Sequence, residues 1–120
     1  MRRKDTGKLG EKLAQAFLKK KGYRILGTNY LCREGEIDIV ARQGEYLAFI
    51  EVRTKSDLEF GTPEESITPA KMRRLQKAAY HYLYHQDKTP DLWRIDVVVV
   101  ELDGHQKPKR IELIENAVEE

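Results

Sequence analysis

The chain of 120 residues is long enough for one domain, spanning residues 1–120, with a single hydrophobic core. Charged residues make up 35% of it, but 22 basic and 20 acidic residues leave a formal net charge of only +2, so overall charge does not indicate a nucleic-acid-binding protein. A single cysteine excludes an intrachain disulfide framework, and the apolar runs are too short to cross a membrane. No apolar stretch of a signal peptide follows the first cations, so we expect a cytoplasmic protein.

Apolar residues at helical spacing predict a first helix over residues 6–21. Asp5 or Thr6 suits its N-cap, and Gly22 suits the position just after its last turn. Its first turns contain two residues of low helix propensity, which indicates close packing against a neighbouring element: Gly7 and Gly10.

Strand patterns follow this helix. Residues 23–31 predict a strand, and "GEIDIVAR" and "EYLAFIEVRT" alternate around "QG", which predicts a hairpin with Gln43 and Gly44 as its two-residue turn. A loop with a helical turn at "PEESI" then leads to a helix from Pro69 to about residue 85, capped by Thr68. "WRIDVVVVEL" predicts a strand covered on both faces, and "RIELIENAV" a final strand. The order αβββαββ predicts an α/β sandwich: a mixed sheet with a central antiparallel hairpin, flanked by helices.

The predicted hairpin brings acidic residues together. With the turn at "QG", Asp38 lies opposite Phe49 and Glu36 lies opposite Glu51, so Asp38 and Glu51 are diagonal neighbours on one face, about 7–8 Å apart at the backbone. Glu36 lies on the same face as Asp38 and Glu51. Three carboxylates on one face repel each other unless a cation lies between them. Carboxylate oxygens suit Mg²⁺ or Mn²⁺, which also bind substrate phosphates.

A solvated hairpin edge is the alternative interpretation of this pattern. Glu36 and Asp38 would then form cross-strand ion pairs with Arg53 or Lys55. Asp38 and Glu51 are, however, each flanked by large apolar residues, and acids in apolar surroundings usually have a functional reason. The residue pattern therefore favours a site.

The segments "GEKLAQAFLKKKGYRILGTNY", "GEIDIVA", "LAFIEVRTKS", "FGTPEESITPAKMRRLQKAAYHYL" and "WRIDVVVV" occur in the order and spacing of a known family. Over nearly its whole length the chain resembles the YraN family of predicted endonucleases, within the restriction-endonuclease-like, or PD-(D/E)xK, superfamily. The resemblance implies a restriction-endonuclease-like sandwich. It also implies that Asp38 and Glu51 are the two acidic metal ligands, that the Val52 carbonyl is a further ligand, and that Glu11 is an acidic contribution from the first helix. The alternative for Glu11 is an exposed helical glutamate. The metal would activate a water for in-line attack on a phosphodiester and neutralise the charge developing on the phosphate.

The sequence departs from the superfamily pattern at Arg53, which occupies the position of the motif lysine. Arginine is not deprotonated in proteins, so Arg53 is no general base, although it can stabilise a pentacovalent phosphate with two donors. Lys55, one pleat further along the same face, could supply an ammonium group from a displaced position. Three options stay open: an altered active site, a weak enzyme, or a relative that binds nucleic acid without cleaving it.

The second predicted helix carries a cationic surface. Lys71 matches a lysine of the family's second helix, and the resemblance implies that it contacts phosphate; Arg73, Arg74 and Lys77 extend the same surface. A solvated charged face is the alternative for each of them. The aromatic residues at the end of this helix are expected to pack or to be exposed, with base stacking as the lesser alternative: Tyr80, His81, Tyr82, Tyr84 and His85.

Two further residues are expected to have structural roles. Asp96 is expected to pair with Arg94 or to cap a neighbouring backbone group, and Cys32 is expected to contribute packing.

These features together predict a metal-dependent nuclease that uses Mg²⁺ or Mn²⁺ and acts on DNA, branched or flapped by analogy with structure-selective relatives. A non-catalytic nucleic-acid-binding module with the same fold is the first alternative, and a protein-interaction domain with an acidic pocket is the second. The oligomeric state stays open, with a homodimer among the options.

Overall fold

The computed structural model describes residues 3–57, 60–88 and 90–117. Its elements follow the predicted order αβββαββ, with one additional short 3-10 helix, η1, at the predicted helical turn. The elements are α1 (Arg3–Lys20), β1 (Arg24–Cys32), β2 (Gly35–Gln43), β3 (Tyr46–Ser56), η1 (Glu64–Ser66), α2 (Pro69–Tyr84), β4 (Leu92–Leu102) and β5 (Pro108–Ile114). The last predicted strand, 110–118, therefore begins and ends earlier than expected, and residue 118 lies outside the described residues.

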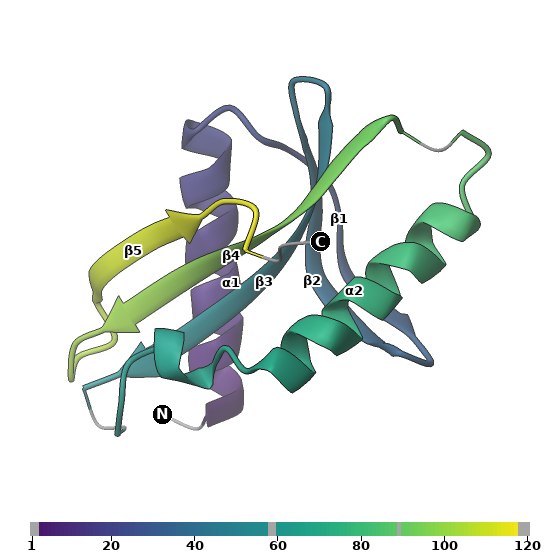
Figure 1. The fold of residues 1–120 in the computed structure, drawn as a ribbon. Helices are drawn as coiled ribbons and strands as arrows, with labels where there is room; N and C mark the ends of the chain where they lie inside the picture. Colours follow the sequence, from purple (N-terminus) through teal and green to yellow (C-terminus); the bar gives the residue numbers. More distant parts are fainter. Residues whose placement is uncertain (1–2, 58–59, 89, 118–120) are drawn as a thin grey trace.

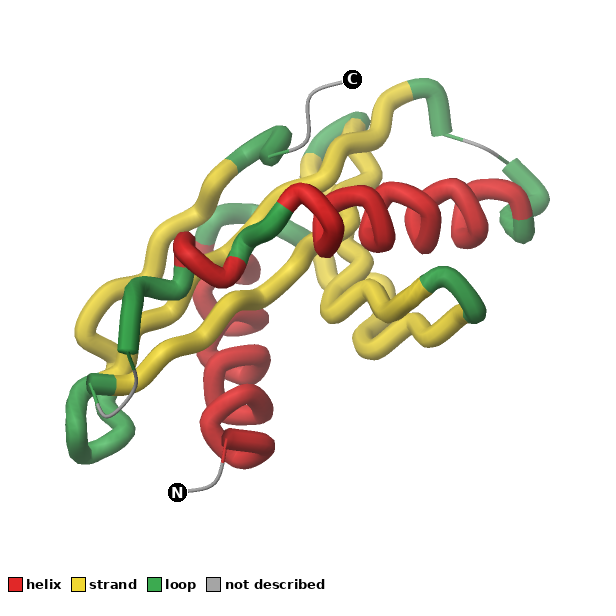
Figure 2. The backbone as a smooth tube through the Cα atoms, turned by 60° about the horizontal axis from the view of Figure 1, so that its bottom comes forward, coloured by secondary structure: helices red, strands yellow, loops and turns green. Residues whose placement is uncertain are grey.

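The five strands form one mixed sheet in the order β1-β2-β3-β4-β5. Neighbouring strands are antiparallel except β3 and β4, which are parallel and are joined by the crossover that contains α2. α1 covers one face of the sheet and α2 the other, as two views agree (Figures 1 and 2). The predicted mixed α/β sandwich with a central antiparallel hairpin is confirmed.

A separate apolar core lies on each face of the sheet. Ala14 and Leu18 of α1 pack against one face, and Leu75 and Ala79 of α2 pack against the other. The valines of β4 are fully buried, as expected for a central strand covered on both sides: Val97, Val98, Val99 and Val100. Among the described residues, no helix is long and apolar enough to cross a membrane.

The ends of the helices test the predicted caps. Gly22 has φ +91°, and the Tyr23 N–H donates to the Leu18 carbonyl at 3.0 Å, which is the helix-ending motif predicted for this glycine. The Thr68 side chain accepts a hydrogen bond from the Lys71 N–H, as predicted for the N-cap of α2. The predicted N-cap of α1 is wrong, because Asp5 and Thr6 both lie inside the helix, which already includes residue 3.

The hairpin turn also differs from the prediction. Gln43 pairs with Tyr46, so the turn residues are Gly44 and Glu45, with φ +58° at Gly44, the pattern of a turn that places glycine first. The register is therefore displaced by two residues from the predicted one. Ile39 pairs with Ile50, and this register, continued, sets residue 38 opposite residue 51 rather than residue 49.

Close packing of α1 occurs at only one of the two glycines expected to need it. A Cβ atom on Gly10 would lie 1.9 Å from Thr54 Oγ1 on β3, whereas a Cβ atom on Gly7 would meet nothing within 4 Å. Gly10 therefore permits the helix to lie against the sheet, and Gly7 does not serve this purpose.

This contrast predicts opposite effects of one substitution in one helix. Gly10→Ala is expected to lower the free energy of unfolding by about 1–3 kcal/mol, because the new methyl group overlaps Thr54. Gly7→Ala is the matched control and is expected to raise stability by up to about 1 kcal/mol through helix propensity. Urea denaturation of both variants measures the difference, and equal effects would contradict the packing role of Gly10.

Candidate active site

The two strands of the hairpin, β2 and β3, separate at Asp38. β2 and β3 pair from the turn as far as Ile39 and Ile50, after which β2 continues beside β1 alone and β3 beside β4 alone (Figure 1). Beyond this point the Val52 N–H of β3 donates to a side chain of β2 instead of to its backbone: Asp38 Oδ2 accepts this hydrogen bond at 2.8 Å. Since the N–H and C=O of one strand residue point toward the same neighbouring strand, the Val52 carbonyl also faces the gap.

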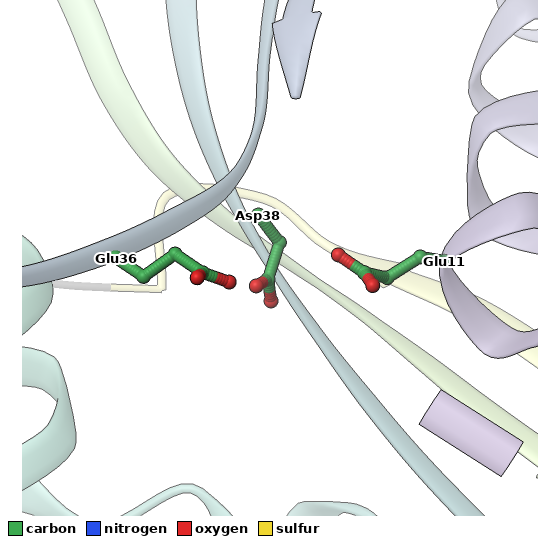
Figure 3. Close-up of side chains that lie close together, drawn as sticks. All are labelled: Glu11, Glu36 and Asp38. Atoms are coloured by element: carbon green, nitrogen blue, oxygen red, sulfur yellow. The ribbon is translucent and has the colours of Figure 1, made fainter. Parts of the chain in front are cut away.

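Carboxyl groups from three elements gather in this gap. Glu36 of β2 and Glu11 of α1 extend toward Asp38 from opposite sides (Figure 3). One carboxylate oxygen of each lies within 4.8 Å of the others, and among the described residues no other group of three acids, histidines or cysteines meets this criterion. Glu51 of β3, with 14% of its side chain exposed, lines the same gap. The expected neighbourhood of Asp38, Glu51 and Glu11 is therefore present.

Three of these acids, Glu11, Glu36 and Asp38, hold protons more tightly than free carboxylic acids. Burial and the adjacent Glu51 carboxyl group raise the pKa of Asp38 to about 8. Burial, together with Asp38 and Glu36, raises the pKa of Glu11 to about 6, and burial and Asp38 raise the pKa of Glu36. A divalent cation relieves this repulsion by replacing the protons, and an all-oxygen donor set suits Mg²⁺ or Mn²⁺. The residues present therefore fit the expected metal.

Arg53 is held beside the acids by two hydrogen bonds. Its Nε donates to Ser66 Oγ at 2.8 Å, and its Nη1 contacts Glu51 Oε2 at 3.4 Å. Ser66 Oγ in turn donates to the Pro63 carbonyl at 2.6 Å, which fixes the hydroxyl group. Sequence reasoning missed Ser66, since a lone serine in a loop forms no pattern that points to a residue on a strand.

The short helix that carries Ser66 is itself tied to the sheet. Arg110 of β5 donates from both terminal nitrogens to the two carboxylate oxygens of Glu64, each at 2.8 Å, and also contacts Glu101 of β4. Such a paired contact between arginine and a carboxylate fixes orientation as well as distance. η1 is thereby held where Ser66 reaches Arg53.

Two hollows open on either side of Asp38 and Glu51. The first has a volume of about 340 Å³ and lies toward α1; it is lined by Thr6, Gly7, Glu11, Asp38, Glu51, Val52, Arg53, Thr54 and Lys55. The second has a volume of about 360 Å³ and lies toward α2; it is lined by Gly35, Glu36, Asp38, Glu51, Lys71, Arg74 and Leu75. The two hollows together contain every predicted catalytic and metal-binding residue, and the acids have cations on both sides.

The cationic residues of α2 divide into two groups. Lys71 and Arg74 line the second hollow, and burial, followed by the nearby charge of Arg53, lowers the pKa of Lys71. Lys77 lines neither of these two hollows and instead borders a separate one further along the helix. The predicted phosphate-contacting set therefore extends beyond the acidic site rather than lying within it.

The residues expected to have structural roles take part in buried contacts. Asp96 accepts hydrogen bonds from Arg94 Nε at 3.1 Å and from the Asn116 backbone N–H at 2.8 Å, which confirms both alternatives predicted for it. Cys32 is partly buried, and its thiol donates to the Gly35 carbonyl. Neither residue lines the acidic site.

The protein is a small α/β domain: a mixed five-stranded sheet has one helix on each face, and acids gather where its central strands separate. We call the two hollows beside Asp38 and Glu51, taken together, the acidic crevice. Residues 10–100 match the family described as "Uncharacterised protein family UPF0102", and the chain belongs to this family. The matched range contains all residues of the crevice named above except Thr6 and Gly7.

Relatives of similar length carry the same family name. The chain is 50% identical over 118 residues to a UPF0102 protein of Dehalococcoides mccartyi, covering 98% of this chain and 96% of the relative. It is 47% identical over 117 residues to that of Moorella thermoacetica, covering 98% of each. It is 44% identical over 115 residues to that of Pelotomaculum thermopropionicum, covering 96% of each.

Proposed function

We propose that this protein is a metal-dependent nuclease that hydrolyses phosphodiester bonds in DNA, as its resemblance to the YraN family and the PD-(D/E)xK superfamily suggests. The observation that carries the proposal is the arrangement around Asp38. Carboxylates from α1, β2 and β3 meet where two strands separate, and cationic side chains border them on both sides. Acids that hold a divalent cation, surrounded by groups that bind phosphate, are what phosphodiester hydrolysis requires.

The residues that would hold the metal are Asp38, Glu51 and the Val52 carbonyl, with Glu11 and Glu36 available on either side. Bound there, the cation would lower the pKa of a water molecule and neutralise charge on the phosphate. Asp38 is oriented for this role by the Val52 N–H, which fixes one of its oxygens.

Arg53 and Lys71 would bind the phosphate from two sides. Arg53 has further N–H donors beyond those directed at Ser66 and Glu51, so it can donate to a phosphate oxygen while remaining fixed. It stays charged throughout and accepts no proton. Lys71, across the gap on α2, supplies the ammonium group that the strand lacks at position 53, and Lys55 borders the first hollow as a further cation.

A cleavage assay tests this proposal. The substrates are linear duplex, flapped, single-stranded and four-way DNA, each incubated with Mg²⁺, with Mn²⁺ and with EDTA. We expect cleavage of at least one substrate only with metal, and Glu51→Gln, which keeps the shape of the side chain, is expected to reduce the rate at least about 100-fold. Arg53→Lys is expected to retain or increase the rate.

The matched variant Glu45→Gln removes an exposed acid of the hairpin turn and is expected to cleave normally. Cleavage that survives Glu51→Gln would assign the activity to a contaminant. No cleavage of any substrate with either metal would contradict the proposed reaction.

A nucleic-acid-binding module without cleavage is the second candidate, favoured by Arg53 in place of a deprotonatable lysine. In that case DNA affinity should fall linearly with the logarithm of salt concentration. Asp38→Asn should leave that affinity unchanged or increase it, because it removes repulsion between the acid and phosphate. Cleavage of DNA by the wild-type protein would therefore indicate the nuclease, and salt-dependent DNA binding without cleavage would indicate the binding module.

A further inference from the structure

α2 carries a line of cations that leads away from the acidic crevice. Lys71 and Arg74 line the hollow beside Asp38, and Lys77 follows at the next three-residue step, on the outer side of the helix. Lys77 borders a further hollow of about 390 Å³, lined also by Glu34, Tyr80, His81, Tyr84 and His85. The cations therefore connect the crevice with an aromatic surface at the C-terminal end of α2.

Two tyrosines of this surface are unusually exposed for large aromatic side chains. Tyr84 is 85% exposed and Tyr80 is 50% exposed, whereas Tyr82, between them, packs against Phe49 in the core. Exposed apolar groups that lie together often mark a binding surface.

The rings are also held in place before any ligand binds. Tyr80 contacts Trp93 edge-on, with ring centres 5.4 Å apart, and Tyr84 contacts His85 in the same way at 5.3 Å. His85 stacks on His81 at 4.2 Å, and His81 is fixed by the Tyr30 hydroxyl at 2.6 Å. Rings supported in this way lose little freedom when a planar group stacks on them.

We propose that the outer surface of α2 binds a single-stranded arm of the DNA substrate, with Lys71, Arg74 and Lys77 on its phosphates and Tyr80 and Tyr84 on its bases. This inference rests on the proposed function, because it takes the crevice as the place where the strand is cut. A line of cations that ends in exposed rings fits a chain of alternating phosphates and planar bases. Duplex DNA keeps its base faces stacked inside the helix, so the tyrosines could stack only on unpaired bases.

The length of the surface sets the length of the arm. Tyr84 follows Lys71 by 13 positions in α2, which corresponds to a rise of about 20 Å along the helix. At a stacked spacing of about 3.4 Å per nucleotide, this distance accommodates about six nucleotides. Fewer are needed if the strand is more extended.

Fluorescence anisotropy in EDTA measures this binding without cleavage. The probes are a blunt DNA duplex and the same duplex with single-stranded oligothymidine arms of increasing length. We expect the arm to increase affinity until it reaches about six nucleotides, and Tyr84→Ala to weaken binding of the armed probe about tenfold without changing the blunt duplex. Tyr80→Ala is expected to act in the same direction, and Tyr84→Trp, which keeps a stacking ring, is expected to retain the affinity.

Tyr46→Ala is the matched control, since Tyr46 is also partly exposed but lies at the hairpin turn, against Arg94. It is expected to bind both probes as the wild-type protein does, and circular dichroism verifies folding of each variant. If the arm adds no affinity, or if Tyr80→Ala and Tyr84→Ala together leave its contribution unchanged, the inference is wrong while duplex binding and cleavage still support a nuclease. If the wild-type protein neither binds nor cleaves any DNA, the proposed function fails as well.

Discussion

Without divalent metal, the free energy of unfolding is expected to fall as the pH rises from about 5 to about 8, and Asp38→Asn is expected to remove most of this fall. Burial is the main cause that raises the pKa of Asp38 from an ordinary value of 3.8 to about 8 in the folded protein. Across this interval the folded state keeps a proton that the unfolded state has lost, so stability decreases as pH rises. Glu11, with a raised pKa of about 6, acts in the same direction at the lower end.

The size of this effect follows from the width of the interval. Each pH unit between the two pKa values of Asp38 corresponds to about 1.4 kcal/mol, so the loss between pH 5 and 8 is at most about 4 kcal/mol. Acids whose pKa is lowered by folding, such as Glu64 and Asp103, change the free energy of unfolding only below about pH 5. Above their ordinary pKa they are ionised in both the folded and the unfolded state, so their stabilising contribution is constant. The window therefore reports mainly on the crevice.

Urea denaturation in EDTA at several pH values measures the slope. Adding Mg²⁺ or Mn²⁺ should restore stability, by about 2.7 kcal/mol at 100 times the dissociation constant, and more at pH 8 than at pH 5 because protons compete for the same oxygens. Asp38→Asn should be insensitive to the metal and should be more stable than the wild type at pH 8 in EDTA. Equal slopes for the wild type and Asp38→Asn would contradict the assignment of the effect to Asp38.

Asp96→Ala is expected to lower the free energy of unfolding by about 3–5 kcal/mol, the second large effect. Asp96 is completely buried and accepts hydrogen bonds from Tyr23, Arg94 and the Asn116 backbone. Its removal leaves the Arg94 guanidinium, only 11% exposed, without its buried counter-ion and leaves the other donors unpaired. Tyr23 also follows the end of α1, so the loss extends to the contact between helix and sheet.

An exposed ion pair provides the comparison for this variant. Asp57 and Lys109 lie 3.0 Å apart, and about half of each side chain is exposed. Asp57→Ala is expected to change stability little, because solvent screens such pairs. Urea denaturation of both variants at pH 7 should separate them clearly, and a similar cost would indicate that burial of Asp96 is not what makes its contacts stabilising.

The alternation of residues predicts the shared face of Asp38 and Glu51 even though the predicted register is wrong. Moving the turn from residues 43 and 44 to residues 44 and 45 shifts the pairing by two residues, and strand side chains repeat with a period of two. The shift therefore changes the cross-strand partner of each residue but not the face of the sheet on which its side chain lies. The position of the turn could not be derived, because glycine with positive φ fits either place in a two-residue loop.

Contacts between distant elements were less predictable. Glu11 and Lys71 could be assigned to the site only through family resemblance, because helical spacing alone does not say which sheet face a helix end approaches. The bond between Arg53 and Ser66 requires η1 to be held by Arg110, a residue far away in the sequence. The start of α1 was misplaced because Asp5 and Thr6 resemble caps, while Thr6 is buried inside the helix.

The bond from the Val52 N–H to Asp38 gives one side chain a role both in the separation of the strands and in the acidic cluster of the crevice. Because the carboxylate stands where a backbone carbonyl would otherwise continue the ladder, it keeps β2 and β3 apart. Asparagine at position 38 would keep a side-chain oxygen that accepts from the Val52 N–H, and with it the separation of the two strands. Valine at position 38 would remove this acceptor, and β2 and β3 would then be free to continue their backbone pairing.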